Sequence, residues 1–180
     1  MNKQSIYFER AGLRHEKMIF QWLDGPHIKE FWDNSPEHRK DIAIFIRGRK
    51  EPTPYHDGIF TYWIGSIDDV PYCLLMTSEV LDVPNLPEGW REYLSKSGTT
   101  CSIDFAIGNA NYLGKGHAPK TLKVFTQFIK KEIDPTVDTF IIDPNQNNPK
   151  AKHVYEKAGF TIVSEFSRNN ERYYLMIKHI

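Results

Sequence analysis

The chain has 180 residues, and its content of 40% hydrophobic and 13% aromatic residues is that of a packed globular protein. This length fits a single domain, residues 1–180, with one hydrophobic core. The 23 basic and 23 acidic residues cancel, so no net charge favours nucleic acid or an anionic membrane, and a small molecule or a peptide is the expected partner. No apolar run typical of a signal peptide or of a membrane span is apparent, which predicts a cytoplasmic protein.

The first half of the chain predicts helices and strands separated by turn signals. Gly25-Pro26 is expected to end the first helix, because proline cannot continue a helix beyond its first turn. Asp68-Asp69 lies between two segments rich in β-formers and predicts the turn of a hairpin. The expected elements are a strand over residues 6–9, a helix around residues 18–23, a helical stretch over residues 27–32 that resumes after residue 36 and runs to residue 46, and strands over residues 60–67 and 71–79.

The second half opens with a long excursion, residues 81–100, that is rich in Pro and Gly and is a candidate binding segment. Asn148-Pro149 predicts an N-cap followed by proline at the first helical position, and Gly159 predicts the end of that helix. The expected elements are a strand over residues 101–107, a loop over residues 108–116, a helix over residues 118–133, a strand over residues 137–142, a helix over residues 150–158, and strands over residues 160–166 and 172–177.

Two cysteines, Cys73 and Cys101, lie inside apolar segments that read as strands. The chain has no Cys/His cluster with the spacing of metal ligands. We therefore expect two buried thiols and no metal site.

Two glycines follow a predicted strand and open a predicted helix in the segment Leu113-Gly114-Lys115-Gly116-His117-Ala118. Backbone N–H groups at such a helix start can converge on an anion, and the small residues let the main chain approach a pyrophosphate closely. A tight turn that needs glycine for its backbone alone would explain this motif equally well.

A second strand-to-helix unit carries a longer and more specific pattern. Asn148, Ala151, Tyr155, Gly159 and Phe160 occupy every specified position of the pattern Asn-x-x-Ala-x-x-x-Tyr-x-x-x-Gly-Phe. In this segment the chain resembles the GNAT superfamily of N-acetyltransferases. The glycine segment resembles the pyrophosphate loop of the same superfamily, (Gln/Arg)-x-x-Gly-x-(Gly/Ala).

The resemblance implies a fold, a cosubstrate and a set of binding residues. The fold is α+β in α/β/α layers, with a mixed, largely antiparallel central sheet flanked by helices and a splayed, V-shaped cofactor cleft. Acetyl-coenzyme A is the implied cosubstrate. Asn111 stands where the loop pattern has Gln or Arg, which removes one polar contact and leaves the backbone cradle intact. The residues implied to bind the cofactor are Ile107, Leu113, Gly114, Lys115, Gly116, His117, Ala118 and Asn148.

Within the superfamily the chain is most similar to aminoglycoside 6'-N-acetyltransferases, over most of its length. Siderophore-biosynthetic acetyltransferases share part of the same pattern, so the resemblance fixes the reaction better than the acceptor. It implies direct acetyl transfer to a primary amine, the 6'-amine of an aminoglycoside or similar polycation. A role in antibiotic resistance is a further step that the sequence does not decide. The matching segments are Trp22-Leu23, residues 27–32, Ile103-Asp104, residues 113–116, Asp143-Pro144 and residues 155–160.

Two residues are the candidates for proton transfer in such a reaction. Asp104 would accept a proton from the amine, directly or through water, or orient it, because side chains on the strand before the loop point toward the thioester. Tyr155 would donate a proton to the departing thiolate, since a phenol with a reference pKa of about 10 has a suitable acidity. The alternatives are a carboxylate bonded to loop backbone for Asp104 and a core aromatic for Tyr155.

Further residues are candidates for holding the acceptor. Asp143 would bind a second ammonium group, although Asp before Pro also forms turns and caps. Trp90 and Glu88 would supply an aromatic wall and a carboxylate, although an exposed loop can carry both without such a role. His27 and Trp32 are expected to pack where the first helices meet.

Alternative functions remain open at this point. The chain could acetylate a protein or peptide amine or a siderophore hydroxylamine, or bind coenzyme A without catalysis. Acidic residues around the thioester would favour a polycation as acceptor over a peptide amine or a hydroxylamine. A monomer and a homodimer are equally compatible with the sequence.

Overall fold

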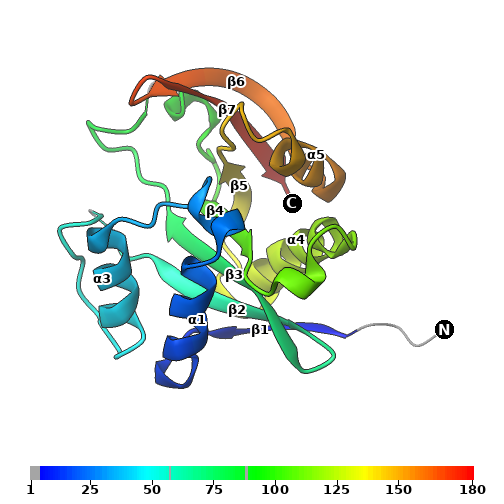
Figure 1. The fold of residues 1–180 in the computed structure, drawn as a ribbon. Helices are drawn as coiled ribbons and strands as arrows, with labels where there is room; N and C mark the ends of the chain where they lie inside the picture. Colours follow the sequence, from blue (N-terminus) through cyan, green and yellow to red (C-terminus); the bar gives the residue numbers. More distant parts are fainter. Residues whose placement is uncertain (1–4, 57, 88) are drawn as a thin grey trace. The chain divides into compact units, whose positions relative to one another are not determined.

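The computed structural model describes residues 5–56, 58–87 and 89–180 (Figure 1). These residues form two compact units, and each is described by itself. Unit 1 comprises the part of the chain up to Ser78 together with residues 104–115, and unit 2 comprises residues 79–103 and 116–180. That they act as one domain stays a prediction.

The described residues contain seven strands, joined in a sheet of the order β1-β2-β3-β4-β5-β7-β6. The strand pairings within each unit are antiparallel except for β4 with β5, so the predicted mixed, largely antiparallel α+β fold with flanking helices is confirmed. The strands are β1 (Ile6–Arg10), β2 (Thr61–Ile67), β3 (Val70–Glu79), β4 (Thr99–Ile107), β5 (Val137–Ile142), β6 (Thr161–Arg168) and β7 (Glu171–His179). The helices are α1 (Glu16–Leu23), α2 (Pro26–Lys29), α3 (Pro36–Phe45), α4 (His117–Phe128) and α5 (Pro149–Ala158).

Unit 1 is built on the antiparallel strands β1, β2 and β3. Asp68 and Asp69 have φ angles of 47° and 66°, and the left-handed conformation at both central residues gives a hairpin turn whose twist matches the strands. The hairpin predicted at these two residues is confirmed.

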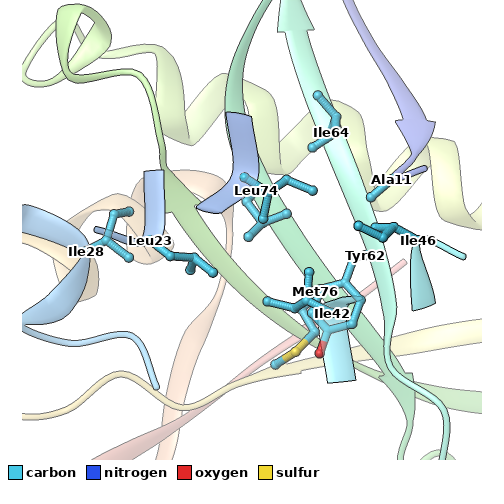
Figure 2. Packing of buried hydrophobic residues seen from close by; sticks show 10 residues of the cluster. Ala11, Leu23, Ile28, Ile42, Ile46, Tyr62, Ile64, Leu74 and Met76 are labelled. Atoms are coloured by element: carbon cyan, nitrogen blue, oxygen red, sulfur yellow. The ribbon is translucent and has the colours of Figure 1, made fainter. Parts of the chain in front are cut away.

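The core of unit 1 lies between its helices and one face of β2 and β3, as Figure 2 shows for most of its members. Tyr62 and Ile64 of β2 are two residues apart, as are Leu74 and Met76 of β3. Because every second side chain of a strand points to the same face, all four point into this core. The helical members of this core are Ile19 and Leu23 of α1, Ile28 of α2, and Ile42 of α3 with Ile46 directly after it.

The predicted helical stretch after Gly25-Pro26 is shorter than expected. The helix α2 covers four residues, and turns of the chain then continue to Trp32, whose N–H donates to the carbonyl of Ile28 at 2.9 Å. A new helix begins after Ser35, because the Ser35 hydroxyl accepts from the N–H of His38 at 3.2 Å and Pro36 takes the first helical position.

Unit 2 contains the parallel part of the sheet and the β6–β7 hairpin. The first half of β4 pairs with β5 from Thr99 opposite Val137 to Ser102 opposite Ile141. β5 pairs with β7, and β7 with β6, in antiparallel register. Asn169 and Asn170, with φ angles of 52° and 63°, form the hairpin turn.

Opposite faces of the β5–β7 strands in unit 2 meet different partners. Lys178 of β7 donates to the hydroxyl of Thr126 in α4 at 2.7 Å, so this face of β7 meets the helix. The neighbouring side chains of Ile177 and Ile141 point the other way and pack with Trp90 of the excursion. The excursion thus contains a helical turn at Arg91–Tyr93, and the strand that follows begins at Thr99, two residues earlier than predicted.

Three further observations bear on the predictions. Cys73 and Cys101 are buried free thiols, as expected, and burial raises the pKa of Cys101 to about 12. The helix predicted up to residue 133 ends its α-helical part at Phe128 and continues as a π-helical turn over Ile129–Ile133. In the part of the chain that the structure describes, no helix has the length and apolarity needed to cross a membrane.

Candidate active site

The glycine segment forms the start of α4. Gly114 and Gly116 have φ angles of 71° and 76°, which side chains rarely allow, and a Cβ added at either position would meet no atom within 4 Å. The first turn of α4 contains no acidic residue. Its positive end is therefore open to an anion, and this loop fits a pyrophosphate. The cofactor contacts expected from Leu113 to Ala118 stay predictions.

The helix α5 begins at a residue with two expected roles. The side-chain oxygen of Asn148 accepts from the N–H of Ala151 at 3.0 Å, and Pro149 follows at the first helical position. The predicted N-cap is confirmed, and Gly159, with a φ angle of 95°, ends the helix as predicted. Because the side-chain oxygen of Asn148 accepts this capping hydrogen bond, the side-chain N–H groups of Asn148 would be the ones to contact a cofactor.

Tyr155 lies in the last turn of α5 and is 7% exposed. Its ring lies 6.3 Å from that of Phe160, and its carbonyl accepts from the N–H of Phe160 at 3.0 Å. The residues of the Tyr-x-x-x-Gly-Phe pattern thus fix the tyrosine at the end of the helix. The phenol's role as an acid stays a prediction.

Asp104 lies on β4 directly after the buried Ile103 and is itself partly exposed. Alternation along the strand therefore turns it away from the side chain of Ile103. Burial raises the pKa of Tyr55 above its usual range, and the negative charges of Asp33 and Asp104 act in the same direction. Asp104 and Tyr55 are thus close enough to interact within unit 1, where a partly exposed carboxylate can serve as a proton acceptor.

A polar and aromatic cluster in unit 1 accompanies Asp104 and was not predicted. The hydroxyl of Tyr55 donates to the carboxylate of Asp33 at 2.6 Å. The ring of His38 stacks on Tyr55 with centroids 4.7 Å apart, and its Nδ1 lies 2.6 Å from the carbonyl of Asp33. Burial lowers the pKa of His38, so the ring is neutral near pH 7 and Nδ1 carries the proton that it donates.

The sequence offered only one signal for this cluster. Asp33 accepts from the N–H of Ser35 at 2.9 Å, which is the turn that commonly precedes a capped helix. Tyr55 comes from a loop without a recognisable motif. Only the tertiary fold of unit 1 brings it to Asp33 and Asp104.

Three other residues singled out from the sequence also lie in unit 1. Ile107 ends β4, and its carbonyl lies 2.9 Å from Nε2 of His27. The ring of Trp32 is stacked on that of His38 with centroids 5.9 Å apart. His27 and Trp32 therefore make packing contacts inside unit 1, as expected. The cofactor role of Ile107 stays a prediction.

Unit 2 holds the residues expected on the acceptor side. The side chain of Asp143 is 15% exposed and its carboxylate lies 3.3 Å from the guanidinium of Arg168. Burial raises the pKa of Asp143 to about 6, against the opposing effect of Arg168. Trp90 is 7% exposed, and its ring meets that of Phe166 edge-on at 5.8 Å, so it packs in a core and not on an exposed loop. Glu88 lies outside the described residues.

Residues 12–168 match the family model of the acetyltransferase (GNAT) domain. The chain therefore belongs to the GNAT acetyltransferase family and is an acetyl-coenzyme A-dependent N-acetyltransferase. Among the residues that the structure describes, no group of His, Cys, Asp or Glu side chains could hold a metal ion.

Several similar proteins are aminoglycoside acetyltransferases by name. An aminoglycoside N(6')-acetyltransferase type 1 from Klebsiella pneumoniae is 27% identical over 143 residues, which cover 79% of this chain and 67% of the relative. The structure of an aminoglycoside N(6')-acetyltransferase from Legionella pneumophila has a TM-score of 0.75 at 26% identity, covering 98% of this chain and 93% of that one. An aminoglycoside acetyltransferase solved with coenzyme A and kanamycin shares the fold, with a TM-score of 0.75 at 21% identity over 97% of this chain and 95% of that one.

Proposed function

We propose that this enzyme transfers an acetyl group from acetyl-coenzyme A to a primary amine of an aminoglycoside or similar polycation, at the 6' position of an aminoglycoside. The observation that carries the donor side is the start of α4, where two left-handed glycines leave the backbone open to a pyrophosphate. The relatives, whose names include aminoglycoside N(6')-acetyltransferase, support the acceptor.

Two side chains of the enzyme handle the protons of this reaction. Acetyl-coenzyme A supplies the acyl group as a thioester. Asp104 accepts the proton that the amine loses when its nitrogen bonds to the acyl carbon, directly or through water. Tyr155 donates its phenolic proton to the thiolate that leaves when the carbon–sulfur bond breaks, and it regains a proton from solvent. No acetylated side chain is required.

The charges near Asp104 in unit 1 support a cationic acceptor. Asp33 and Asp104 lie near Tyr55 in unit 1, and burial and the Asp33 hydrogen bond keep the Tyr55 hydroxyl protonated as a donor. Fixed carboxylates orient ammonium groups and reject neutral competitors.

Thiol release from acetyl-coenzyme A tests this proposal, with kanamycin, a peptide amine and a hydroxylamine compared as acceptors. Kanamycin-dependent release is expected, with kcat lowered about 100-fold in Tyr155→Phe because the general acid is lost. Tyr174→Phe, which removes a phenol elsewhere in the same unit, is the matched control. Release with the peptide or the hydroxylamine alone would sink the acceptor assignment, and cofactor binding without any release would sink catalysis.

Asp104→Asn tests the base in the same assay. We expect kcat with kanamycin to fall about 100-fold while the affinity for acetyl-coenzyme A is kept, since Asp104 is assigned to the amine. Asp82→Asn, an exposed position of unit 2, controls for the loss of a charge. An unchanged kcat in Asp104→Asn would remove Asp104 from the mechanism.

A further inference from the structure

One face of the β6–β7 hairpin in unit 2 carries a cationic side chain between aromatic rings. The register places Phe166 opposite Tyr173 and Arg168 opposite Glu171, so these four side chains share a face. The rings of Phe166 and Tyr173 are stacked with centroids 5.5 Å apart. The guanidinium carbon of Arg168 lies 4.6 Å from the centroid of Tyr173 and 6.0 Å from that of Phe166, within the range of a cation–π contact.

The segment that carries Asp143 is held firmly against this hairpin. The carboxylate of Glu171 accepts from the hydroxyl of Tyr173 and from the side-chain amide of Asn145, each at 2.8 Å. The N–H of Tyr174 donates to the carbonyl of Pro144 at 3.0 Å. These bonds fix the Tyr173 ring and the chain next to Asp143, and none of them involves Arg168.

The two partners of the Arg168–Asp143 ion pair differ in exposure. The carboxylate side chain is 15% exposed and the arginine side chain 49%. A half-exposed arginine loses little when it turns into water, because exposed ion pairs are weak. The mostly buried carboxylate, in contrast, is fixed in place and favours a cation beside it. The site thus has a fixed anion and an exchangeable cation.

An ammonium group of a polycation would find the same surroundings as the guanidinium. It would meet a carboxylate, and the faces of two aromatic rings that attract a cation by their quadrupoles. Trp90 packs edge-on against Phe166 and supports that ring from behind. The hairpin face together with Asp143 therefore has the composition of a cation-binding cage that already contains a cation of the chain itself.

We propose that Arg168 is an internal competitor that occupies the position of an acceptor ammonium group at Asp143 and thereby determines which acceptors are bound. This inference rests on the proposed function, in which Asp143 binds a second ammonium group of the acceptor. An acceptor must displace the guanidinium before it reaches Asp143. Polycations, which present several ammonium groups at once, displace it more readily than simple amines. Arg168 is thus a specificity-determining residue.

The experiment measures kanamycin binding by calorimetry without acetyl-coenzyme A, at about pH 8, where Asp143 is ionised. Arg168→Met keeps a long side chain over Tyr173 and removes the competing charge. It should bind kanamycin about 3- to 10-fold more tightly than the wild type. Arg168→Lys keeps the charge and should gain much less affinity than Arg168→Met. In an Asp143→Asn background, Arg168→Met should bring no gain, because the shared anion is gone.

The outcomes separate this inference from the proposed function. Kanamycin binding that is unchanged, weaker or absent in a folded Arg168→Met protein overturns the inference, and Arg168→Gln repeats the test with a second uncharged side chain. Thermal unfolding shows whether each variant is folded. Thiol release with kanamycin in the wild type tests the proposed function on its own. If Arg168→Met binds kanamycin more tightly but the wild type releases no thiol with it, the cation-binding cage is supported and the acceptor assignment is overturned. If the wild type releases thiol but Arg168→Met binds no more tightly, only the role of Arg168 as a competitor is overturned.

Discussion

One aspartate–arginine pair in each unit has a largely buried carboxylate, and these two pairs have different surroundings. In unit 1, Asp41 and Arg49 form an ion pair whose side chains are 1% and 5% exposed. In unit 2, the side chains of Asp143 and Arg168 are 15% and 49% exposed. The residue types are identical, so their burial and their other partners must decide what each pair does.

The partners of Asp41 account for the first pair. Its carboxylate accepts from the hydroxyl of Tyr62 at 2.8 Å and from that of Thr53, besides the guanidinium of Arg49. Arg49 also donates to the carbonyl of Phe60 at 3.3 Å. Both charges are thus enclosed and hydrogen-bonded, and no incoming cation could replace the arginine. The comparison teaches that exposure of the cation distinguishes a structural ion pair from one that a ligand can exchange.

The largest expected effect comes from breaking the enclosed pair. Arg49→Met should lower the free energy of unfolding by about 3–5 kcal/mol, because it leaves the carboxylate of Asp41 buried without its counter-charge. Urea unfolding measures this. Arg47→Met, which breaks the exposed pair with Glu16, is the matched control and should cost less than about 1 kcal/mol. Equal losses in both variants would refute the distinction.

Removing one neutral partner of Asp41 should cost less than removing the cation. Tyr62→Phe deletes the hydroxyl that donates to this carboxylate and keeps the buried ring. We expect a loss of about 1–3 kcal/mol in the same unfolding measurement, the usual cost of an unmade buried hydrogen bond. Tyr7→Phe, on a partly exposed ring of β1, should change stability by less than about 0.5 kcal/mol. A neutral effect of Tyr62→Phe would show that water replaces the hydroxyl.

Neither pair could be predicted from the sequence, although most of the fold around them could. The hairpin turn at Asp68-Asp69 and the capped start of α5 at Asn148 are local signals, and the structure confirms them. Asp41 lies within a predicted helix, and Arg49 lies beyond the end of that helix. Their shared burial depends on Tyr62, which comes from a strand more than ten residues later.

The candidate site divides in the same way. The glycines before α4 and the position of Tyr155 follow from short patterns whose spacing fixes the geometry locally. Tyr55 and Asp33 meet only through the fold of unit 1, and Arg168 reaches Asp143 only through the register of the last hairpin. Side chains brought together by tertiary contacts leave no periodic trace in the sequence, which is why these residues were not predicted.

The exchangeable pair should make acceptor binding depend on pH. Burial raises the pKa of Asp143 to about 6, so this carboxyl loses its charge as the pH falls through that value. Kanamycin binding should weaken about tenfold between pH 7 and pH 5 by calorimetry. Asp143→Asn should remove this part of the dependence. A dependence that persists in Asp143→Asn would assign it to another group.

The smallest expected effect is the change in stability when the arginine of the second pair is replaced by methionine. Arg168→Met should change the free energy of unfolding by less than about 1 kcal/mol, against about 3–5 kcal/mol for Arg49→Met, because the guanidinium of Arg168 is half exposed to water that already screens it. Urea unfolding at about pH 7 measures both variants under one condition. A loss as large as that of Arg49→Met would make Arg168 a structural partner of Asp143. An ammonium group could then not displace the guanidinium without unfolding this part of unit 2, and Arg168 could not act as a competitor.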